Sequence, residues 1–188
     1  MGTSLMASCP VARHMVEQVD EALGGELLSI MTNGPEDELK MTRNAQPALM
    51  ATAVATVRSL EKATGKSIDQ MADFVAGHSL GEYSAMTAVH VFDIEVAARL
   101  LRHRGDAMQA AVPAGEGAMA ALLGVDVDAV ENILAGVDGL VEIANDNSAV
   151  QVVISGAAEP VNQAIAAAKD AGVRRAMLLP VSAPFHCG

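Results

Sequence analysis

The chain has 188 residues, of which 51% are hydrophobic, and its formal net charge is −11 at pH 7. This acidic balance excludes nucleic acid as a partner, because phosphate binding requires clustered Lys and Arg side chains. No apolar run approaches the roughly 18 residues that a membrane span needs, and no signal peptide is recognisable, so we expect no membrane partner. Cys9 and Cys187 lack metal-ligand spacing, which predicts a reduced, cytoplasmic protein without a metal site.

Apolar residues recur at helical spacing in the first part of the chain. The spacing predicts helices over residues 11–23, 47–63 and 94–111, the last of them closed by Pro113. A turn is expected at residues 33–35, where Asn, Gly and Pro follow one another. A chain of this length is expected to form one domain, or one domain that carries a small insertion.

Between the second and third of these helices lies the most informative stretch, the Gly-x-Ser-x-Gly pattern of residues 77–81. A short apolar run at residues 74–76 precedes it and predicts a strand, and residues 82–88 follow as a helix. This context is typical of a nucleophile elbow, in which the flanking glycines let the chain fold back tightly. We therefore predict that Ser79 is a nucleophile and that the backbone N–H of Leu80 stabilises an oxyanion.

After the third helix the pattern changes to shorter segments. These segments predict a strand, a helix, two strands, a helix and a strand, which is the ferredoxin-like order. Residues 145–148 are the predicted loop between the middle strands. We expect an α/β fold in which residues 1–115 and 182–188 form the body and residues 116–181 an inserted α+β subdomain. The expected strands are 118–123, 141–144, 150–154 and 176–181, and the expected helices are 128–135 and 160–171.

A serine hydroxyl needs a base that takes its proton before it can attack. His186 follows a strand end and a proline turn, in the kind of loop where catalytic residues lie. His186 is therefore the predicted base, with a plain loop histidine as the alternative. His78 neighbours the serine, but adjacent side chains diverge on an elbow, so we expect a packing or substrate-facing role for it.

Arg104 lies on the apolar stripe of helix 94–111, three residues after Leu101 and four before Met108. A guanidinium that faces the core is costly unless it is paired. One interpretation is a structural ion pair with an internal Asp or Glu, or a side chain that extends to solvent. The other is a substrate carboxylate, which a planar guanidinium binds through two parallel hydrogen bonds. Beside a serine nucleophile, we favour the substrate carboxylate.

Together these residues resemble the malonyl-CoA:acyl-carrier-protein transacylase family, which includes the acyltransferase domains of fatty-acid and polyketide synthases. The family's architecture, a hydrolase-like α/β body with a ferredoxin-like insertion, agrees with the change of pattern after the third helix. The matching pieces occur in family order and cover nearly the whole chain. They are Gln46-Pro47-Ala48-Leu49, residues 77–85, Arg104-Gly105, residues 117–121, residues 147–156 and residues 180–186.

The resemblance implies that Ser79 is acylated by malonyl-CoA, that His186 is its base and that the Leu80 amide contributes to the oxyanion hole. It also implies that Arg104 pairs with the malonyl carboxylate, and that the phosphopantetheine thiol of acyl carrier protein receives the malonyl group. No cofactor is implied, since malonyl-CoA is a substrate. Phe185 directly precedes the predicted base, and its bulky side chain would crowd an α-methyl branch on the substrate. Ordinary packing of Phe185 is the alternative. The candidates for substrate-facing residues are His78, Asn147 and Phe185.

The chain departs from the family pattern at both ends. Family members begin with a strand and a Gly-Gln-Gly-x-Gln loop whose glutamine contributes to the oxyanion hole, and they continue well past the catalytic histidine. We therefore expect this chain to be the middle part of a transacylase, weakly active or inactive alone. Two alternatives stay open. One is a serine esterase or thioesterase, with an acid such as Asp126 completing a triad, and the other is a non-catalytic fragment.

Overall fold

The computed structural model describes residues 1–113, 115–181 and 183–188. Within these ranges the chain divides into two compact units, Met1–Ala107 and Met108–Gly188. Each unit has a hydrophobic core of its own. None of the helices in these ranges combines the length and the apolar character that crossing a membrane requires.

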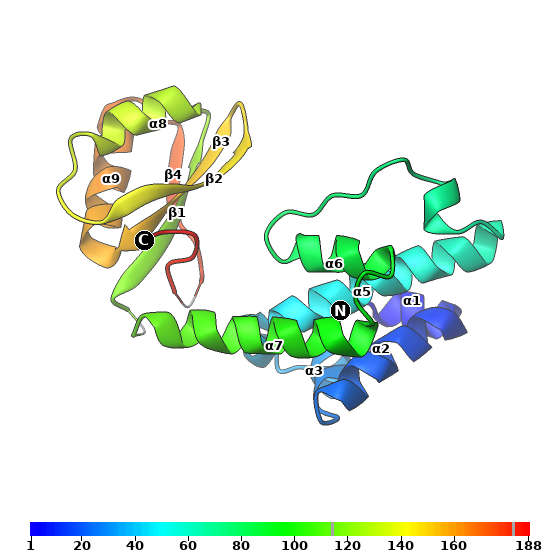
Figure 1. Ribbon diagram of the computed structural model, residues 1–188. Coiled ribbons are helices and arrows are strands. Elements are labelled where there is room, and N and C mark those ends of the chain that lie inside the picture. Colours follow the sequence, from blue (N-terminus) through cyan, green and yellow to red (C-terminus); the bar gives the residue numbers. More distant parts are fainter. Residues whose placement is uncertain (114, 182) are drawn as a thin grey trace. The chain divides into compact units, whose positions relative to one another are not determined.

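The first unit is built from helices, and α2 and α5 pack side by side within it (Figure 1). The predicted first and third helices are confirmed as α2 and α7, and the helix after the serine is confirmed as α6. The elements are α1 (Thr3–Ser8), α2 (Pro10–Ala22), α3 (Leu27–Asn33), α4 (Glu36–Lys40), α5 (Thr42–Thr64), the 3-10 helix η1 (Ile68–Gln70), α6 (Gly81–Ala88) and α7 (Ile94–Ala111).

The predicted start of the second helix is wrong, because α5 begins at Thr42 rather than near Pro47. Proline favours the first turn of a helix, since it lacks an N–H and leaves the carbonyl four residues earlier without a helical partner. Here Pro47 is buried inside the helix, and the affected carbonyl is that of the exposed Arg43 in the first turn. The cost is therefore confined to one carbonyl near the start of the helix.

One buried cluster joins α2, α5 and α7. Val16 and Val19 from α2, Met50 and Val54 from α5, and Leu101 from α7 are each at most 1% exposed. Burying a side chain of this size stabilises the fold by about 1.5–3 kcal/mol relative to leaving it in water. This core fixes α5 and α7, both of which carry candidate site residues.

The predicted strand at residues 74–76 is absent from the described part of the first unit. Phe74 is 92% exposed and Val75 is 41% exposed, so the apolar run is not buried. A strand is held by hydrogen bonds to a neighbouring strand, and the described residues of this unit supply none. The prediction was wrong because it considered only the local pattern.

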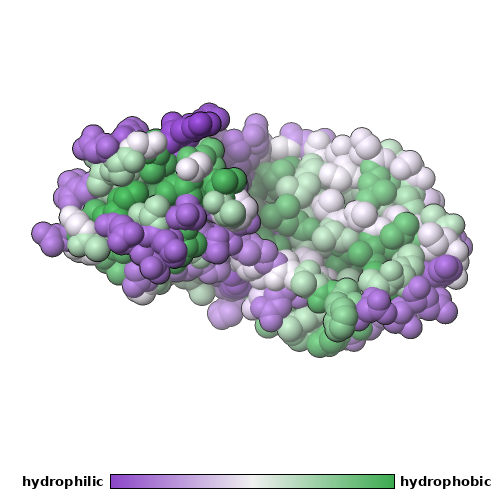
Figure 2. Space-filling view, turned by 90° about the horizontal axis from the view of Figure 1, so that it is seen from above, coloured by the Kyte–Doolittle hydropathy of each residue, from purple (hydrophilic) through white to green (hydrophobic). Residues whose placement is uncertain are grey.

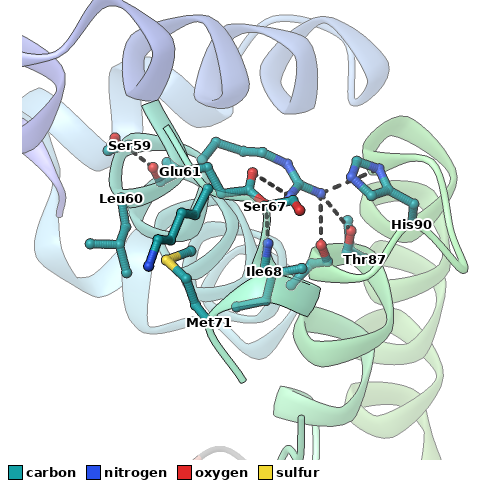
Figure 3. Close-up of polar contacts among 12 residues, drawn as sticks. Ser59, Leu60, Glu61, Ser67, Ile68, Met71, Thr87 and His90 are labelled. Carbon is teal, nitrogen blue, oxygen red and sulfur yellow. Dashed lines mark hydrogen bonds and ion pairs between the residues drawn. The ribbon is translucent and has the colours of Figure 1, made fainter. Parts of the chain in front are cut away.

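An ion pair on α5 links three parts of the first unit. The Arg58 guanidinium and the Glu61 carboxylate lie 2.8 Å apart, with side chains 14% and 17% exposed. Figure 3 shows Glu61 close to Ile68, with Thr87 in the last turn of α6 and His90 just after α6 on the other side of the ion pair. Burial raises the pKa of Glu61, but hydrogen bonds from Arg58 and from the Ile68 amide, with the charges of Arg58 and His90, hold that pKa below its usual value.

We expect Glu61→Gln to lower the free energy of unfolding by about 1–3 kcal/mol at neutral pH, since Arg58 loses its charged partner. The pKa of Glu61 is lower in the folded chain than in the unfolded chain. The contribution is therefore complete above the unfolded pKa and is lost as the pH falls through the folded pKa. Urea unfolding at neutral and at progressively lower pH measures this difference, which should shrink in acid. A difference that stays constant with pH would contradict the assignment.

The second unit contains an antiparallel sheet with strand order β2-β3-β1-β4 (Figure 1). The order of elements along the chain agrees with the predicted order. β4 stops earlier than predicted, although the Leu179 N–H still donates to the Met119 carbonyl. The elements are β1 (Gly117–Leu123), α8 (Val127–Leu134), β2 (Val141–Ser148), β3 (Gln151–Ala157), α9 (Ala158–Asp170) and β4 (Arg175–Leu178).

Both faces of this sheet carry apolar side chains. Leu122, Val152 and Ile154 belong to a buried cluster with residues of α8 and α9. Met119 and Val153 form a smaller cluster with other partners. Because successive side chains of a strand point to opposite faces, burial of both faces explains why β1 and β3 are nearly continuous apolar runs.

The predicted loop at residues 145–148 is wrong, because β2 continues through Ser148. Asn, Asp and Ser favour turns when only the local sequence is considered. Here β3 supplies a hydrogen-bonding partner along the whole segment, with irregularities between Ile143 and Asn145 and between Asp146 and Ser148. The pairing with β3 therefore overrides the turn preference.

The last described residues contact strands β1 and β2 of the second unit. A Cβ added to Gly117 would lie 2.2 Å from the Pro184 ring, so the two residues pack closely. The Gly188 N–H donates to the Glu142 carboxylate at 3.0 Å. That residues 182–188 belong to the body stays a prediction, and Ser182 lies outside the described residues.

Candidate active site

The predicted tight turn is confirmed at Ser79, whose φ of 53° lies in the left-handed region. A residue other than Gly rarely adopts this conformation, and where it occurs the surrounding structure must hold it. The Gly81 N–H donates to the His78 carbonyl at 2.8 Å and closes the turn. α6 begins directly after this turn, so Ser79 stands at the helix N-terminus.

The two glycines of the motif differ in what they contribute. A Cβ added to Gly77 would lie 1.9 Å from the carbonyl carbon and oxygen of Gly81 and 2.2 Å from the Glu82 nitrogen. These are backbone atoms that cannot move aside. A Cβ added to Gly81 would meet nothing within 4 Å in the described structure. The close approach that requires glycine is therefore at Gly77.

The Arg104 guanidinium reaches the serine. Its Nη2 donates to Ser79 Oγ at 3.1 Å, and its Nη1 donates to the side-chain oxygen of Gln46 on α5. Gln46 is 2% exposed, and its own amide nitrogen donates to Thr42 Oγ1 at 3.0 Å. One hydrogen-bonded chain thus runs from α5 through Arg104 to the serine hydroxyl.

Close packing of two helices creates this contact. A Cβ added to Gly105 would lie 2.6 Å from the Arg43 Cα, so α7 touches the backbone at the start of α5. Only a residue without a side chain permits that approach. The approach brings Arg104, the neighbour of Gly105, within reach of Gln46.

The interpretation of Arg104 as half of an internal ion pair is not supported. Among the described residues, no carboxylate forms a salt bridge with Arg104. Its hydrogen-bond partners are a neutral amide and a neutral hydroxyl. Since these partners carry no charge, the guanidinium can attract an anionic group beside Ser79.

The Leu80 amide stays the predicted oxyanion donor. Leu80 is the N-cap residue of α6, and no acceptor for its N–H occurs in the described part of the chain. The first N–H groups of a helix lack helical partners and lie at the positive end of the helix dipole. The N–H of Leu80 can therefore donate to a negative oxygen that forms beside Ser79.

An apolar groove of about 590 Å³ adjoins the turn, with Leu49, Val57, Ile68, Val75 and His78 among its lining residues. In Figure 2 the first unit is at the right. Hydrophobic residues (green) and pale residues gather on its visible face, and hydrophilic residues (purple) lie mostly toward the rim. His78 is exposed. Its position on the groove favours the predicted substrate-facing role over a buried packing role.

The other candidates lie in the second unit. His186 is exposed, with a φ of 60°, and its pairing with Ser79 stays a prediction. Phe185 packs against the Met119 and Val153 cluster, and its N–H lies 3.4 Å from the Met119 sulfur. Asn147 is exposed where the β2–β3 pairing is irregular, and such bulges often redirect a side chain near a site. In the described residues no three His, Cys, Asp or Glu side chains gather as a metal site would need.

The sequence alone predicts no role for Gln46, which belongs to one of the pieces that match the family. For the malonyl transfer that the resemblance implies, we expect Gln46→Leu to slow acylation of Ser79 about tenfold, since Arg104 loses the partner that orients it and a net hydrogen bond to a charged group is lost. Acetyl transfer, which does not use the guanidinium, should change little. Mass spectrometry of the acylated chain with each CoA ester measures both rates. Equal losses for the two esters would contradict this role.

Residues 1–187 match the protein family described as acyl transferase domain. The chain belongs to this family. Among curated acyl transferases, it is 44% identical over 189 residues to the malonyl CoA-acyl carrier protein transacylase of Bacillus subtilis (strain 168), a match that covers 99% of this chain and 58% of that protein. The predicted membership of the transacylase family is confirmed.

Solved acyl transferase structures are also similar. An acyl-carrier-protein-S-malonyltransferase from Bartonella henselae is 50% identical with a TM-score of 0.93, over 99% of this chain and 60% of that one. A type II PKS acyl-carrier protein in complex with its malonyl-transacylase matches with 39% identity and a TM-score of 0.89, over 98% of this chain and 59% of that one. These structures confirm the α/β class, and the chain spans about 60% of the length of these relatives.

Proposed function

We propose that this acyl transferase chain carries the site that moves a malonyl group from CoA to the phosphopantetheine thiol of acyl carrier protein, through an ester on Ser79. The observation that carries the proposal is the Arg104 guanidinium, 3.1 Å from Ser79 Oγ and without a carboxylate partner among the described residues. A cation so close to the nucleophile selects an acyl group that ends in a carboxylate.

The reaction has two halves. His186 takes the proton of the Ser79 hydroxyl as Oγ attacks the thioester carbon, and the Leu80 N–H donates to the oxygen that becomes negative. The C–S bond then breaks, and CoA leaves as a thiol with the proton from His186. In the second half the carrier thiol gives its proton to His186 and attacks the ester. Ser79 recovers its proton, and the malonyl group ends on the carrier.

Several finer assignments belong to the same proposal. Residues 116–181 are a ferredoxin-like subdomain inserted into a hydrolase-like α/β body of residues 1–115 and 182–188. The strand order β2-β3-β1-β4 supports this assignment. Phe185 and Asn147 face the substrate, and the bulk of Phe185 disfavours an α-methyl branch. No cofactor takes part, and the free cysteines agree with a cytoplasmic, reduced protein.

Malonyl-CoA and acyl carrier protein are the proposed partners. Support comes from the names of the relatives and from the structure of a similar malonyl-transacylase bound to a type II PKS acyl-carrier protein. The arrangement on this chain agrees, since the apolar groove beside the turn offers a surface for the uncharged part of a thioester substrate.

Intact-mass spectrometry after brief incubation with malonyl-CoA tests the first half-reaction. We expect a malonyl adduct on the wild-type chain and none on Ser79→Ala, and a carrier protein added afterwards should remove the adduct. Circular dichroism of both proteins is the control for folding. A folded wild-type chain that gains no adduct would show that residues 1–188 do not suffice for acylation.

A further inference from the structure

Two side chains of α5 bind the chain on both sides of the Ser79 turn. After the turn, Arg58 Nη2 donates to the carbonyls of Thr87 at 3.1 Å and Ala88 at 2.9 Å, in the last turn of α6. Before the turn, a Glu61 carboxylate oxygen accepts from the Ile68 N–H at 2.7 Å, at the start of η1. Figure 3 shows these bonds around Glu61, Ile68 and Thr87.

The two side chains also bind each other, and both are largely buried. The last carbonyls of a helix lack helical partners and lie at the negative end of its dipole, so a guanidinium placed there both satisfies and stabilises them. Arg58 serves two carbonyls and one carboxylate at once, which requires the planar fork of arginine rather than the point charge of lysine. His90 Nδ1 lies 3.4 Å from the same guanidinium nitrogen.

The turn between these anchors needs support. The left-handed backbone at Ser79 is strained, and such strain persists only where the surroundings hold it. Packing contributes little just before the turn, since Phe74 is 92% exposed. Upstream, the Ile68 N–H is bound to Glu61, and the Met71 sulfur accepts a weaker bond from Thr64 of the same helix. Downstream, the end of α6 is bound to Arg58.

We propose that Arg58 is a positioning residue, which with Glu61 clamps both flanks of the Ser79 turn and thereby holds the serine hydroxyl toward Arg104. Neither side chain touches the hydroxyl. The clamp acts by keeping α6 and η1 fixed to α5, so that the turn cannot relax to an unstrained backbone. Its consequence for acylation rests on the proposed function, whereas its consequence for the turn does not.

Hydrogen–deuterium exchange of the full chain tests the clamp without any reaction. Arg58→Met removes every bond of the guanidinium, and Arg58→Lys keeps the charge beside Glu61 without the fork. Arg13→Met is the control, because it breaks the Arg13–Glu17 ion pair on the surface of the same unit. We expect amides 78–84 to exchange at least tenfold faster in Arg58→Met and to a lesser degree in Arg58→Lys, while amides of α2 in both variants exchange as in the wild type. In Arg13→Met, amides 78–84 should exchange as in the wild type.

The rate at which malonyl-CoA acylates Ser79, per folded molecule, gives the second measurement. We expect about a 10- to 100-fold loss in Arg58→Met, since a displacement of about 1 Å suffices for such an effect, and no loss in Arg13→Met. Two results would overturn the proposal. One is exchange that rises equally in α2 and at the turn. The other is exchange at the turn that stays unchanged in Arg58→Lys and in a folded Arg58→Met. If the wild type is not acylated, the proposed function fails for this chain, and the exchange at residues 78–84 still decides the clamp.

Discussion

Replacing Arg104 with Ala is expected to slow malonyl transfer to Ser79 by about 10²–10³-fold, which is the usual cost of removing one partner of a hydrogen-bonded charge pair. Acetyl transfer should stay nearly constant or rise. The guanidinium lies 3.1 Å from the serine hydroxyl, where it can bind the free carboxylate of malonyl. An acetyl group offers no such partner and leaves a desolvated cation unpaired, so the side chain disfavours acetyl in the wild type.

The measurement is the ratio of acylation rates with malonyl-CoA and acetyl-CoA, followed by intact mass. Arg99→Ala is the matched control, since Arg99 is an exposed cation on the same helix. Arg104→Lys should fall between wild type and Ala, because it keeps the charge but loses the two parallel hydrogen bonds. A serine esterase would be nearly indifferent to all three changes. An unchanged ratio in Arg104→Ala would therefore favour the esterase.

The helices of the first unit could be predicted because their information is local. Apolar residues at helical spacing mark α2 and α7, and each is closed by a residue that ends helices. The strand predicted at residues 74–76 is absent from the described structure, because a strand depends on a partner elsewhere in the chain and not on its local pattern alone. β2 shows the converse, since pairing with β3 extends it through residues that favour turns.

The residues of the candidate site also differ in how far the local sequence predicts their roles. The turn at Ser79 could be predicted from the motif, since the close backbone approach that marks it lies between Gly77 and Gly81. Gln46 carries a weaker signal, a neutral polar residue on a buried helix face, which must find a hydrogen-bond partner. Arg58 carries none, because its role depends on carbonyls of α6 that lie far along the chain.

Gly77→Ala is expected to disrupt the turn and, with it, the reaction. The new Cβ would lie 1.9 Å from the backbone of Gly81, which cannot move without displacing the start of α6. Overpacking usually lowers the free energy of unfolding by about 1–3 kcal/mol and sometimes by more, and an immovable backbone contact belongs to the upper end. Displacement of Ser79 by about 1 Å would further slow acylation about 100-fold. Urea unfolding and intact mass after malonyl-CoA measure the two effects.

Gly81→Ala is the matched control, with the same chemical change four residues away. Its Cβ would meet nothing within 4 Å in the described structure, and Gly81 is the first residue of α6. Alanine is favoured over glycine in the interior of a helix by about 0.5–1 kcal/mol. At the first residue of α6 the gain is smaller, so this variant should be about as stable as the wild type or slightly more stable. The two glycines of one motif thus have opposite expected outcomes. If Gly77→Ala proved as stable and as reactive as Gly81→Ala, the tight contact between Gly77 and Gly81 could not be what holds Ser79 in place.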